Sequence, residues 1–375
     1  MQILTVDIGT GTQDILLFDS ARAIENSLKL VMPSPTLLIG QEVRAATAAG
    51  RPLLITGVLM GGGPVSWAVE DHRRAGLRVL ATPEAAQTFN DDLDQVRAQL
   101  GIEIIADEEG RRLAERADFA HVEFRDFDYH AVERAFAAFG VELRPDALAL
   151  AVFDHGAAPP EISDRQFRMD YLAERLRQDA RLSTFAHRGP ETPAIMTRLA
   201  ALAGTALRQA GLPTVVMDTA PAAVLGAWHD PRVAAQPHPL IVNVGNFHTL
   251  AFQFNGGRFV RLFEHHTGLM TRETLARWLT ALADGSLRHD AVFADHGHGA
   301  LVLDAAPLPL TFIAVVGPRR GLLADAGLPI YNAVPYGDQM LTGCYGLLAA
   351  CADLEPAWRE PIADALAGRT DRSLW

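Results

Sequence analysis

Cysteine is scarce in this sequence, because Cys344 and Cys351 are the only two among 375 residues. A fold held together by disulfide bonds is therefore not expected, and we predict a cytoplasmic protein. The sequence also lacks a long apolar run, since no stretch approaches the roughly 18 consecutive apolar residues of a membrane-spanning helix. A secretory signal peptide is not expected either, because no basic residues precede the first apolar run, which already carries Asp7.

Basic residues are in the minority: 33 Lys and Arg stand against 45 Asp and Glu, which gives a net charge of −12. An acidic surface does not attract a polyanion, so neither a nucleic acid nor an anionic membrane is expected as a partner. A nucleotide remains compatible with this charge, because a few backbone N–H groups and a metal ion can neutralise phosphates locally. Apolar residues make up 49% of the chain, which is enough for well-buried cores in two or three domains.

The pattern of apolar residues predicts an α/β protein in which short strands alternate with helices. The predicted strands cover residues 3–8, 13–18, 25–32, 53–59, 77–81, 102–106, 119–124, 147–153, 214–217 and 311–316, and the predicted helices cover 65–75, 83–100, 128–139, 193–210 and 272–284, with another helix from about Asp338. The helix at 193–210 has Thr192 as its predicted N-cap and Gly211 past its end.

The segment Asp7–Thr12, "DIGTGT", separates the first two predicted strands. Glycine lets the backbone approach a phosphate closely, and threonine hydroxyl and backbone N–H groups can donate to phosphate oxygens. A carboxylate at the end of a strand can hold Mg²⁺, directly or through water. The alternative is a polar β-turn, which would not by itself favour an inward-facing Asp7 within an apolar run. We therefore predict a phosphate loop, with Asp14 on the returning strand supporting the loop or the metal.

A unit of strand, polar glycine loop and strand occurs twice, at 3–18 and again at 240–254. Two halves that each begin with such a hairpin resemble the actin-like ATPase superfamily, which includes sugar kinases, heat-shock chaperone ATPases and actin. Five segments are similar to landmarks of that family and occur in the same order: "LTVDIGTGTQDILLFD" (4–19), "VVMDTAPAAVLGA" (215–227), "IVNVGNFHTLAF" (241–252), "FIAVVGPRRGLL" (312–323) and "PYGDQMLTGCYGLLAA" (335–350). More narrowly, the chain resembles an actin-like family that carries the label of pyruvate formate-lyase activating enzyme.

The resemblance implies an α/β fold in which two ribonuclease H-like domains of the actin-like ATPase fold enclose a cleft, with a large α/β insertion in the first domain. The first domain would comprise residues 1–32 and 146–227, with the C-terminal helices of 338–375 packing back onto it. The insertion would comprise 33–145, and the second domain 228–337.

The resemblance also implies that the cleft binds ATP with Mg²⁺ for ATP hydrolysis or phosphoryl transfer coupled to domain closure. Asp7 would position the metal, and Asp218 or Asp154 would act as the base. The residues implied in nucleotide binding are Gly9, Thr10, Gly11, Thr12 and Gln13 in the first loop, Asn243, Gly245, Asn246, His248 and Thr249 in the second, and Gly317 and Arg319 on the adenosine side.

The second loop departs from the family, because Asn243 stands where an aspartate is expected. Asparagine can accept a hydrogen bond from metal-bound water but adds no negative charge. A second hypothesis follows: the protein binds a nucleotide without useful catalysis and acts as a switch or activator for a partner protein. The label of a radical-generating activase conflicts with the composition, because such an enzyme needs three clustered cysteines for its iron–sulfur centre and this chain has two cysteines.

A third hypothesis is a small-molecule enzyme that uses the glycine loop "MGGGP" (60–64) of the insertion together with histidines. Three glycines before a helix make a plausible anion site, although a tight strand–helix turn has the same sequence. Histidines cluster in "FDHG" (153–156), "EHHTG" (264–268) and "ADHGHG" (294–299). The spacing of His296 and His298 beside Asp295 is compatible with a metal, and the alternative is a set of hydrogen-bonding turn residues.

Overall fold

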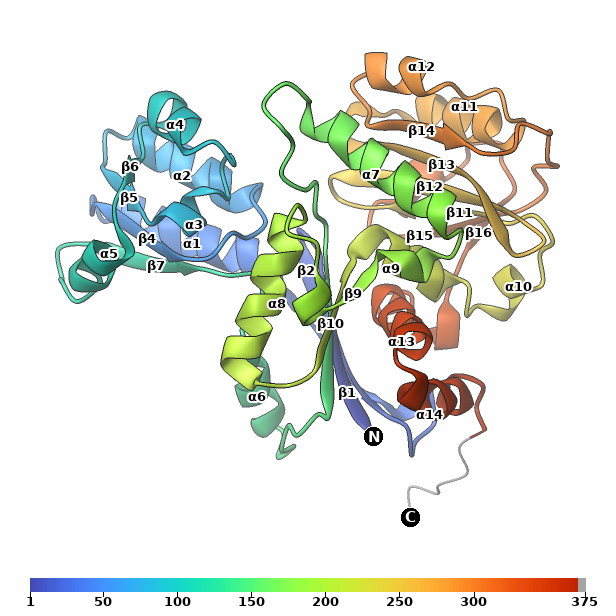
Figure 1. Cartoon of the computed structure of the whole chain (residues 1–375), viewed down its shortest axis with the longest axis horizontal. Coiled ribbons are helices and arrows are strands. Elements are labelled where there is room, and N and C mark those ends of the chain that lie inside the picture. The colour runs from blue at the N-terminus through green and yellow to red at the C-terminus, as the bar shows by residue number, and fades with distance from the viewer. Residues whose placement is uncertain (370–375) are drawn as a thin grey trace.

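The computed structural model describes residues 1–369, whose strands form three sheets (Figure 1). The first sheet has the strand order β3-β2-β1-β8-β10-β9. Its strands are β1 (Gln2–Ile8), β2 (Thr12–Asp19), β3 (Leu28–Pro33), β8 (Ala147–Val152), β9 (Ala186–Arg188) and β10 (Thr214–Asp218). Because β1 pairs antiparallel with β2 and parallel with β8, the N-terminal hairpin lies beside a parallel half-sheet.

The second sheet has the order β14-β13-β12-β11-β15-β16. Its strands are β11 (Leu240–Val244), β12 (His248–Asn255), β13 (Arg258–His266), β14 (Gly299–Val302), β15 (Ile313–Val316) and β16 (Ile330–Asn332). Five of its strands, β13-β12-β11-β15-β16, repeat the order and the strand directions of β3-β2-β1-β8-β10. This duplication is the arrangement of the two ribonuclease H-like halves of the actin-like ATPase fold, which confirms the predicted fold class.

The third sheet lies in the chain between β3 and β8 and is parallel throughout, with the order β6-β5-β4-β7. Its strands are β4 (Leu53–Gly57), β5 (Val79–Ala81), β6 (Glu103–Ile104) and β7 (Ala120–Phe124), and its helices are α1 (Pro35–Ala48), α2 (Pro64–Arg74), α3 (Pro83–Ala86), α4 (Leu93–Gln95) and α5 (Asp107–Ala114). Figure 1 shows this unit standing apart from the other two sheets. The next helix, α6 (Tyr129–Ala137), packs instead into the core of the first sheet.

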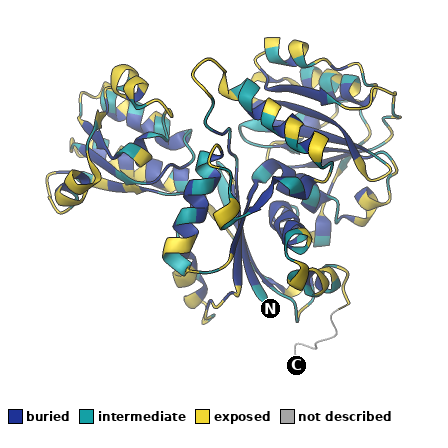
Figure 2. Ribbon diagram, viewed as in Figure 1, coloured by how far each residue is buried: buried dark blue, intermediate teal, exposed yellow. Residues whose placement is uncertain are grey.

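The remaining helices surround the two duplicated sheets. They are α7 (Asp164–Gln178), α8 (Thr197–Ala210), α9 (Thr219–Ala227), α10 (Pro231–Ala234), α11 (Arg272–Ala283), α12 (His289–Ala294), α13 (Thr342–Leu354) and α14 (Pro356–Leu366). The strands and the inner helix faces are buried, whereas the outer helix faces are exposed (Figure 2). Among the described residues, no helix combines the length and the apolar character that a membrane crossing requires.

Helices α9 and α13 pack against each other between the two duplicated sheets (Figure 1). Two glycines make this close crossing possible. A Cβ on Gly226 would overlap the backbone oxygen of Thr342, and a Cβ on Gly346 would overlap the backbone oxygen of Ala222. The small side chains of the connector at 215–227 are therefore required for the close packing of α9 against α13.

Several boundaries differ from the sequence-based predictions. Helix α8 begins at Thr197 rather than at Pro193, because the chain from Gly189 to Glu191 forms a separate turn in which the Thr192 hydroxyl donates to the Gly189 oxygen at 2.8 Å. The helix predicted over 83–100 is broken into short pieces, with Asp92 capping the N-terminus of α4. Helices α1, α5 and α7 were not predicted, although the buried residues Met169, Leu172, Ala173 and Leu176 of α7 do lie at helical spacing.

Candidate functional site

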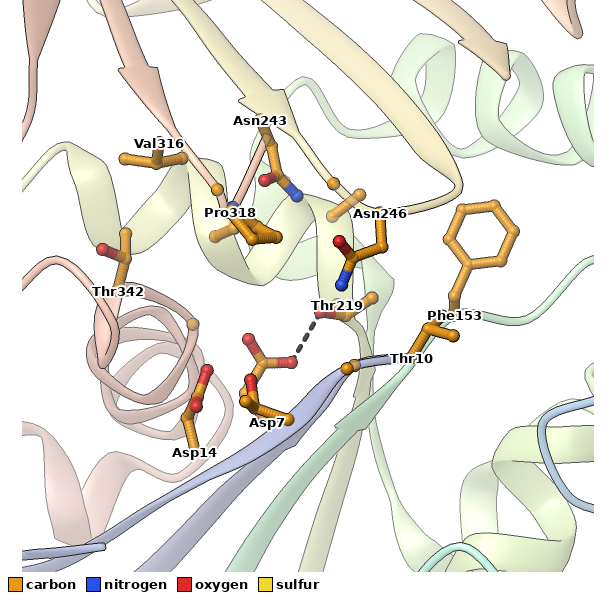
Figure 3. A pocket seen from close by; sticks show the side chains of 18 of the residues that line it. Asp7, Thr10, Asp14, Phe153, Thr219, Asn243, Asn246, Val316, Pro318 and Thr342 are labelled. Carbon is orange, nitrogen blue, oxygen red and sulfur yellow. Dashed lines mark hydrogen bonds between the residues drawn. The ribbon is translucent and has the colours of Figure 1, made fainter. Parts of the chain in front are cut away.

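Two glycine loops, one from each duplicated sheet, face each other across the central cleft (Figure 3). Both loops have the same turn: the Gly9 N–H donates to the Thr12 oxygen at 2.9 Å, and the Gly245 N–H donates to the His248 oxygen at 2.9 Å. The loops touch, because a Cβ on Gly11 would lie 2.8 Å from the side-chain nitrogen of Asn246. Equivalent turns on equivalent hairpins thus meet at one place.

The loops enclose a cavity of about 140 Å³. The residues predicted from the sequence that line it are Asp7, Gly9, Thr10, Gly11, Thr12, Asn243, Gly245, Asn246, His248 and Gly317. Gln13, Thr249 and Arg319 do not line it. The Gln13 side chain donates instead to the Pro33 backbone oxygen at 3.0 Å. Thr249 is buried, and its hydroxyl lies 2.9 Å from the Thr267 hydroxyl. Arg320 lines the cavity in place of Arg319.

Asp7 and Asp14 form a pair of carboxylates at the floor of the cavity, opposite each other in the register of β1 and β2 (Figure 3). Burial raises the pKa of Asp7 to about 6, against the Thr219 hydroxyl that donates to it at 2.5 Å. Burial, followed by the charge of Asp7, raises the pKa of Asp14 to about 8. Near neutral pH the pair therefore holds one proton.

This carboxylate pair fits a divalent cation. Within the described part of the chain, the Asp14 Oδ1 atom is buried and has no hydrogen-bond partner. Carboxylate oxygens are the ligands that Mg²⁺ prefers, and a cation would replace the shared proton. Glycine at Gly343, in the first turn of α13, leaves room for Asp7, because a Cβ there would overlap the carboxylate.

The opposing hairpin offers no such charge. Asn243 occupies the position in β11 that Asp7 occupies in β1, and its partner in the register is Leu250 rather than an acid. The Asn243 side-chain oxygen lies next to Gly317, where a Cβ would come within 2.6 Å of it. The cleft therefore has a carboxylate pair on one side and no counterpart to it at Asn243 and Leu250 on the other.

Asp218 lies at the end of β10 but outside the cavity lining, in a buried ion-pair network. Arg168 on α7 donates to the Asp218 carboxylate at 2.6 Å and to the Glu264 carboxylate on β13 at 2.8 Å. It also donates to the backbone oxygen of Asp154 at 2.6 Å. Asp218 also accepts the Ala220 N–H at 3.0 Å, at the start of α9. Burial raises the pKa of Glu264 to about 7, although Arg168 opposes the shift.

Asp154 is also buried and accepts two backbone N–H groups, from Gly156 and from Leu199, each at 2.8 Å. The second of these N–H groups belongs to the first turn of α8, so Asp154 stabilises that helix end. Burial raises the pKa of Asp154. Both aspartates suggested as a base thus have their oxygens engaged by the fold, and that role stays a prediction.

A second cavity, of about 680 Å³, lies beside the first and is lined by Gly61, Gly62 and Gly63 of the insertion. The Gly61 N–H is already occupied, because it donates to Asp126 at 3.1 Å. Both carboxylate oxygens of Asp126 in turn accept hydrogen bonds from Arg198, from its Nε atom at 2.7 Å and from its Nη2 atom at 2.9 Å. Arg198 lines both cavities. The glycine loop therefore forms part of a wall, and its predicted role as an anion site stays a prediction.

The histidine motifs separate in the structure. His155, His248 and His298 come together, with one ring nitrogen of each within 4.8 Å of the others. His296 is exposed and lies outside this cluster, and the His265 ring contacts the Asp295 backbone oxygen at 2.9 Å. The predicted pair of His296 and His298 is therefore not brought together as metal ligands, because neighbouring residues of this loop point to different sides.

Sequence reasoning missed Arg168, Arg198, Thr219 and Phe247, and assigned no definite role to Asp14. Arg168 could not be found, since α7 was not predicted and its two carboxylate partners lie 50 and 96 residues away. The signal for Asp14 was its place on the returning strand, because a two-strand register with a short turn sets Asp14 opposite Asp7.

Both cysteines lie buried in α13, and the Cys344 thiol donates to the Asp14 backbone oxygen at 3.1 Å. An iron–sulfur cluster is held by several thiolates that reach one point. Two cysteines on one buried helix do not provide such a site, so the residues present do not fit a cluster of this kind.

Comparison with solved structures gave three examples of similarity over long stretches. An inorganic polyphosphate/ATP-glucomannokinase from Arthrobacter sp. strain KM is 11% identical over 94% of this chain and 99% of its own, with a TM-score of 0.36. A type IV pilus biogenesis complex, PilM–PilN, is 12% identical over 95% of this chain and 99% of that one, with a TM-score of 0.39. A ROK family transcriptional regulator, a homolog of the E. coli MLC protein, is 12% identical over 69% of this chain, with a TM-score of 0.26, and the chain spans 38% of that regulator's length.

No curated protein matches the sequence. A protein-family profile does match, over residues 60–322, which is more than half of the chain. The match begins at the glycine loop of the third sheet and extends past β15 of the second. The chain belongs to the family described as "Putative pyruvate format-lyase activating enzyme (DUF1786)".

Proposed function

We propose that the cleft between the two duplicated sheets binds a nucleotide, ATP with Mg²⁺, for ATP hydrolysis or phosphoryl transfer. One observation carries the proposal: two glycine loops with the same turn meet at a carboxylate pair, of which Asp14 is buried and Asp7 half-buried. Backbone N–H groups of glycine loops are well suited to phosphate oxygens, and a carboxylate pair is suited to the metal that accompanies them.

In this proposal Asp7 and Asp14 hold Mg²⁺, and the two loops bind the phosphates. The metal would neutralise charge on the phosphates, while positioning by the loops supplies the remainder of the catalysis. Gly317 and Arg320 line the end of the cavity nearest to β15, where the adenosine would lie. The acceptor would be water, a small molecule or a group on a partner protein.

Binding would be coupled to movement of the two halves. The cavity of about 140 Å³ is smaller than the 300–1,000 Å³ typical of pockets for drug-sized ligands, and Gly11 touches Asn246 across it. A nucleotide therefore requires the loops to separate. Because each loop belongs to a different sheet, this separation would change the angle between the two halves.

The binding step is tested by thermal unfolding and calorimetry with and without Mg-ATP. A ligand at a hundredfold its dissociation constant should add roughly 2.7 kcal/mol of stability. Asp7→Asn should weaken binding at least about tenfold, which is about 1.4 kcal/mol, because it removes charge at the metal. Asp290→Asn, on an exposed aspartate of α12, is the matched control and should bind as the wild type does. No stabilisation by any nucleotide would exclude the proposal.

A second candidate is a nucleotide-dependent switch without useful catalysis. Two observations favour it: Asn243 leaves the second loop uncharged, and both Asp154 and Asp218 are engaged by the fold. Single-turnover phosphate release separates the two candidates. Release by the wild type that is lost in Asp7→Asn supports an enzyme, whereas tight binding without release supports a switch.

A further inference from the structure

Three histidines from distant parts of the chain meet beside the second glycine loop. His155 follows β8, His248 is the first residue of β12, and His298 precedes β14. The Nε2 atoms of His155 and His298 lie 3.3 Å apart, and one ring nitrogen of each of the three lies within 4.8 Å of the others. The three residues come from both duplicated halves.

Hydrogen bonding alone leaves this cluster unsatisfied. Within residues 1–369, the His248 Nε2 atom is buried and has no hydrogen-bond partner. A buried polar atom without a partner costs about 1–3 kcal/mol, so such atoms usually have a function. The observed 3.3 Å between two ring nitrogens also matches a shared metal, since nitrogens bound tetrahedrally to Zn²⁺ at about 2.0–2.1 Å lie about 3.3 Å apart.

The three rings are neutral near physiological pH and have lone pairs available. Burial, followed by the charge of Arg168, lowers the pKa of His155 to about 3. Burial likewise lowers the pKa of His248 and of His298 well below the ordinary value. Metal ligation requires the neutral imidazole, so no proton needs to be displaced at neutral pH.

The surroundings of the cluster carry charges of both signs, because the guanidinium groups of Arg165, Arg168 and Arg198 lower the pKa of these rings. Arg168 is nearby, but Asp218 and Glu264 both bind it, so this ion-pair network has a net charge of −1 when both carboxylates are ionised. The Glu264 Oε1 atom lies 3.9 Å from the His298 Nε2 atom.

The rings are held in place by packing. The His248 ring is stacked on Phe153, with centroids 4.0 Å apart and planes inclined by 3°. The His155 and His298 rings are nearly parallel, with centroids 5.4 Å apart. His298 is fully buried, whereas His155 and His248 are half-buried. Such fixed ligands lower the cost of ordering a metal site.

The cluster borders both cavities. His155 and His248 line the second cavity, and His248 also lines the first. A site with three protein ligands and one open position is the arrangement of catalytic rather than structural zinc sites. A molecule in the second cavity could reach the open position.

We propose that His155, His248 and His298 bind one Zn²⁺-class divalent cation, with an open coordination position facing the second cavity. This site is separate from the Asp7 and Asp14 pair, which consists of oxygen ligands suited to Mg²⁺. It would place a Lewis acid at the wall between the two cavities, and it would link the two duplicated halves through the metal.

The test is metal binding by the full-length protein in the absence of nucleotide, so its result does not depend on the proposed nucleotide site. Protein freed of metal by a chelator is titrated with Co²⁺ and then with Zn²⁺. We expect visible d–d absorption typical of a four-coordinate Co²⁺ site, loss of that absorption on adding Zn²⁺, and a higher unfolding temperature with Zn²⁺. The absence of all three responses in the wild type would overturn the proposal.

Variants locate the site. His155→Gln and His298→Gln should each weaken Co²⁺ binding at least about 100-fold, because loss of a ligand costs no less than loss of its supporting contacts. The control is His296→Asn, two residues away in the same loop, because Asn tolerates the left-handed backbone at this position (φ 65°). This control should bind Co²⁺ as the wild type does.

Folding of each variant is checked by circular dichroism and by urea unfolding without metal. The proposal is overturned if folded His155→Gln and His298→Gln bind Co²⁺ like the wild type, or if His296→Asn loses as much affinity as they do. If a variant does not fold, the four-coordinate Co²⁺ absorption of the wild type still decides the question.

Discussion

At the scale of single residues, Arg168 links the two duplicated sheets through its ion pairs. It is buried, and it binds Asp218 from the first duplicated sheet and Glu264 from the second. Its guanidinium also lies over the Phe153 ring, 3.8 Å from the centroid. An ion removed from water is tolerated only when its partners replace the lost hydration, and here two carboxylates and a backbone oxygen do so. Arg168 therefore fixes the surroundings of the histidine cluster.

Replacement of Arg168 by methionine should destabilise the protein strongly, since two carboxylates would remain buried without their partner. We expect a loss of about 3–5 kcal/mol in the free energy of unfolding, measured by urea denaturation. Arg181→Met is the matched control, because Arg181 forms an exposed ion pair with Asp179 and should change stability by less than about 1 kcal/mol. A loss of under about 1 kcal/mol for Arg168→Met would show that the network contributes little.

At the scale of elements, the crossing of α9 and α13 depends on glycine. Gly226 and Gly346 allow each helix to contact the backbone of the other, so no side chain separates them. Gly343 in the same helix leaves room for Asp7. Helix α13 touches both α9 and the carboxylate pair. A shift of this helix would therefore be transmitted to the proposed Mg²⁺ site at Asp7 and Asp14.

Two glycine-to-alanine changes within helices should have opposite effects on stability. Gly346→Ala should destabilise by about 1–3 kcal/mol, because the new methyl group would overlap the Ala222 backbone oxygen. Gly204→Ala, in α8, should stabilise by up to about 1 kcal/mol, since it meets only the flexible end of Arg208 at 3.2 Å and alanine favours helix. Urea unfolding of both variants measures this. A stabilising Gly346→Ala would contradict the inferred helix contact.

At the scale of the whole molecule, the third sheet is connected to the second through the Phe247 side chain. The Trp67 ring of α2 lies edge-on to the Phe247 ring, with centroids 5.7 Å apart, and Gly63 leaves room for the same ring. Phe247 also lines both cavities. Movement of the second glycine loop would therefore change the packing of the insertion (residues 33–145) against the Phe247 ring.

Phe247→Ala should loosen the insertion without unfolding the protein. We expect faster hydrogen exchange over residues 60–67, with a change of less than about 1 kcal/mol in global stability, because the cores of the sheets are untouched. Phe139→Ala removes a phenylalanine that is 79% exposed and should leave exchange at 60–67 unchanged. Equal exchange in Phe247→Ala and the wild type would rule out this connection.

The sequence by itself determined the local features of this protein. The loops at Asp7–Thr12 and Asn243–Thr249 were predicted correctly to join two strands, because their glycines and polar side chains encode a turn over a few residues, whereas their binding of phosphate stays a prediction. The cap at Gly211 was found for the same reason, and it has a left-handed backbone. The repeated hairpin led to the fold class because the same local pattern occurs in each half.

Only the tertiary structure decided which distant groups meet. It set Asp14 against Asp7, bound Asp218 to Arg168, and brought His298 to His155 across 143 positions of sequence while leaving His296 exposed. Such contacts depend on how two sheets and the helices between them pack, and no local periodicity encodes that packing. The protonation of the carboxylates and histidines follows from the resulting burial, because a buried charge is costly in proportion to the water it loses.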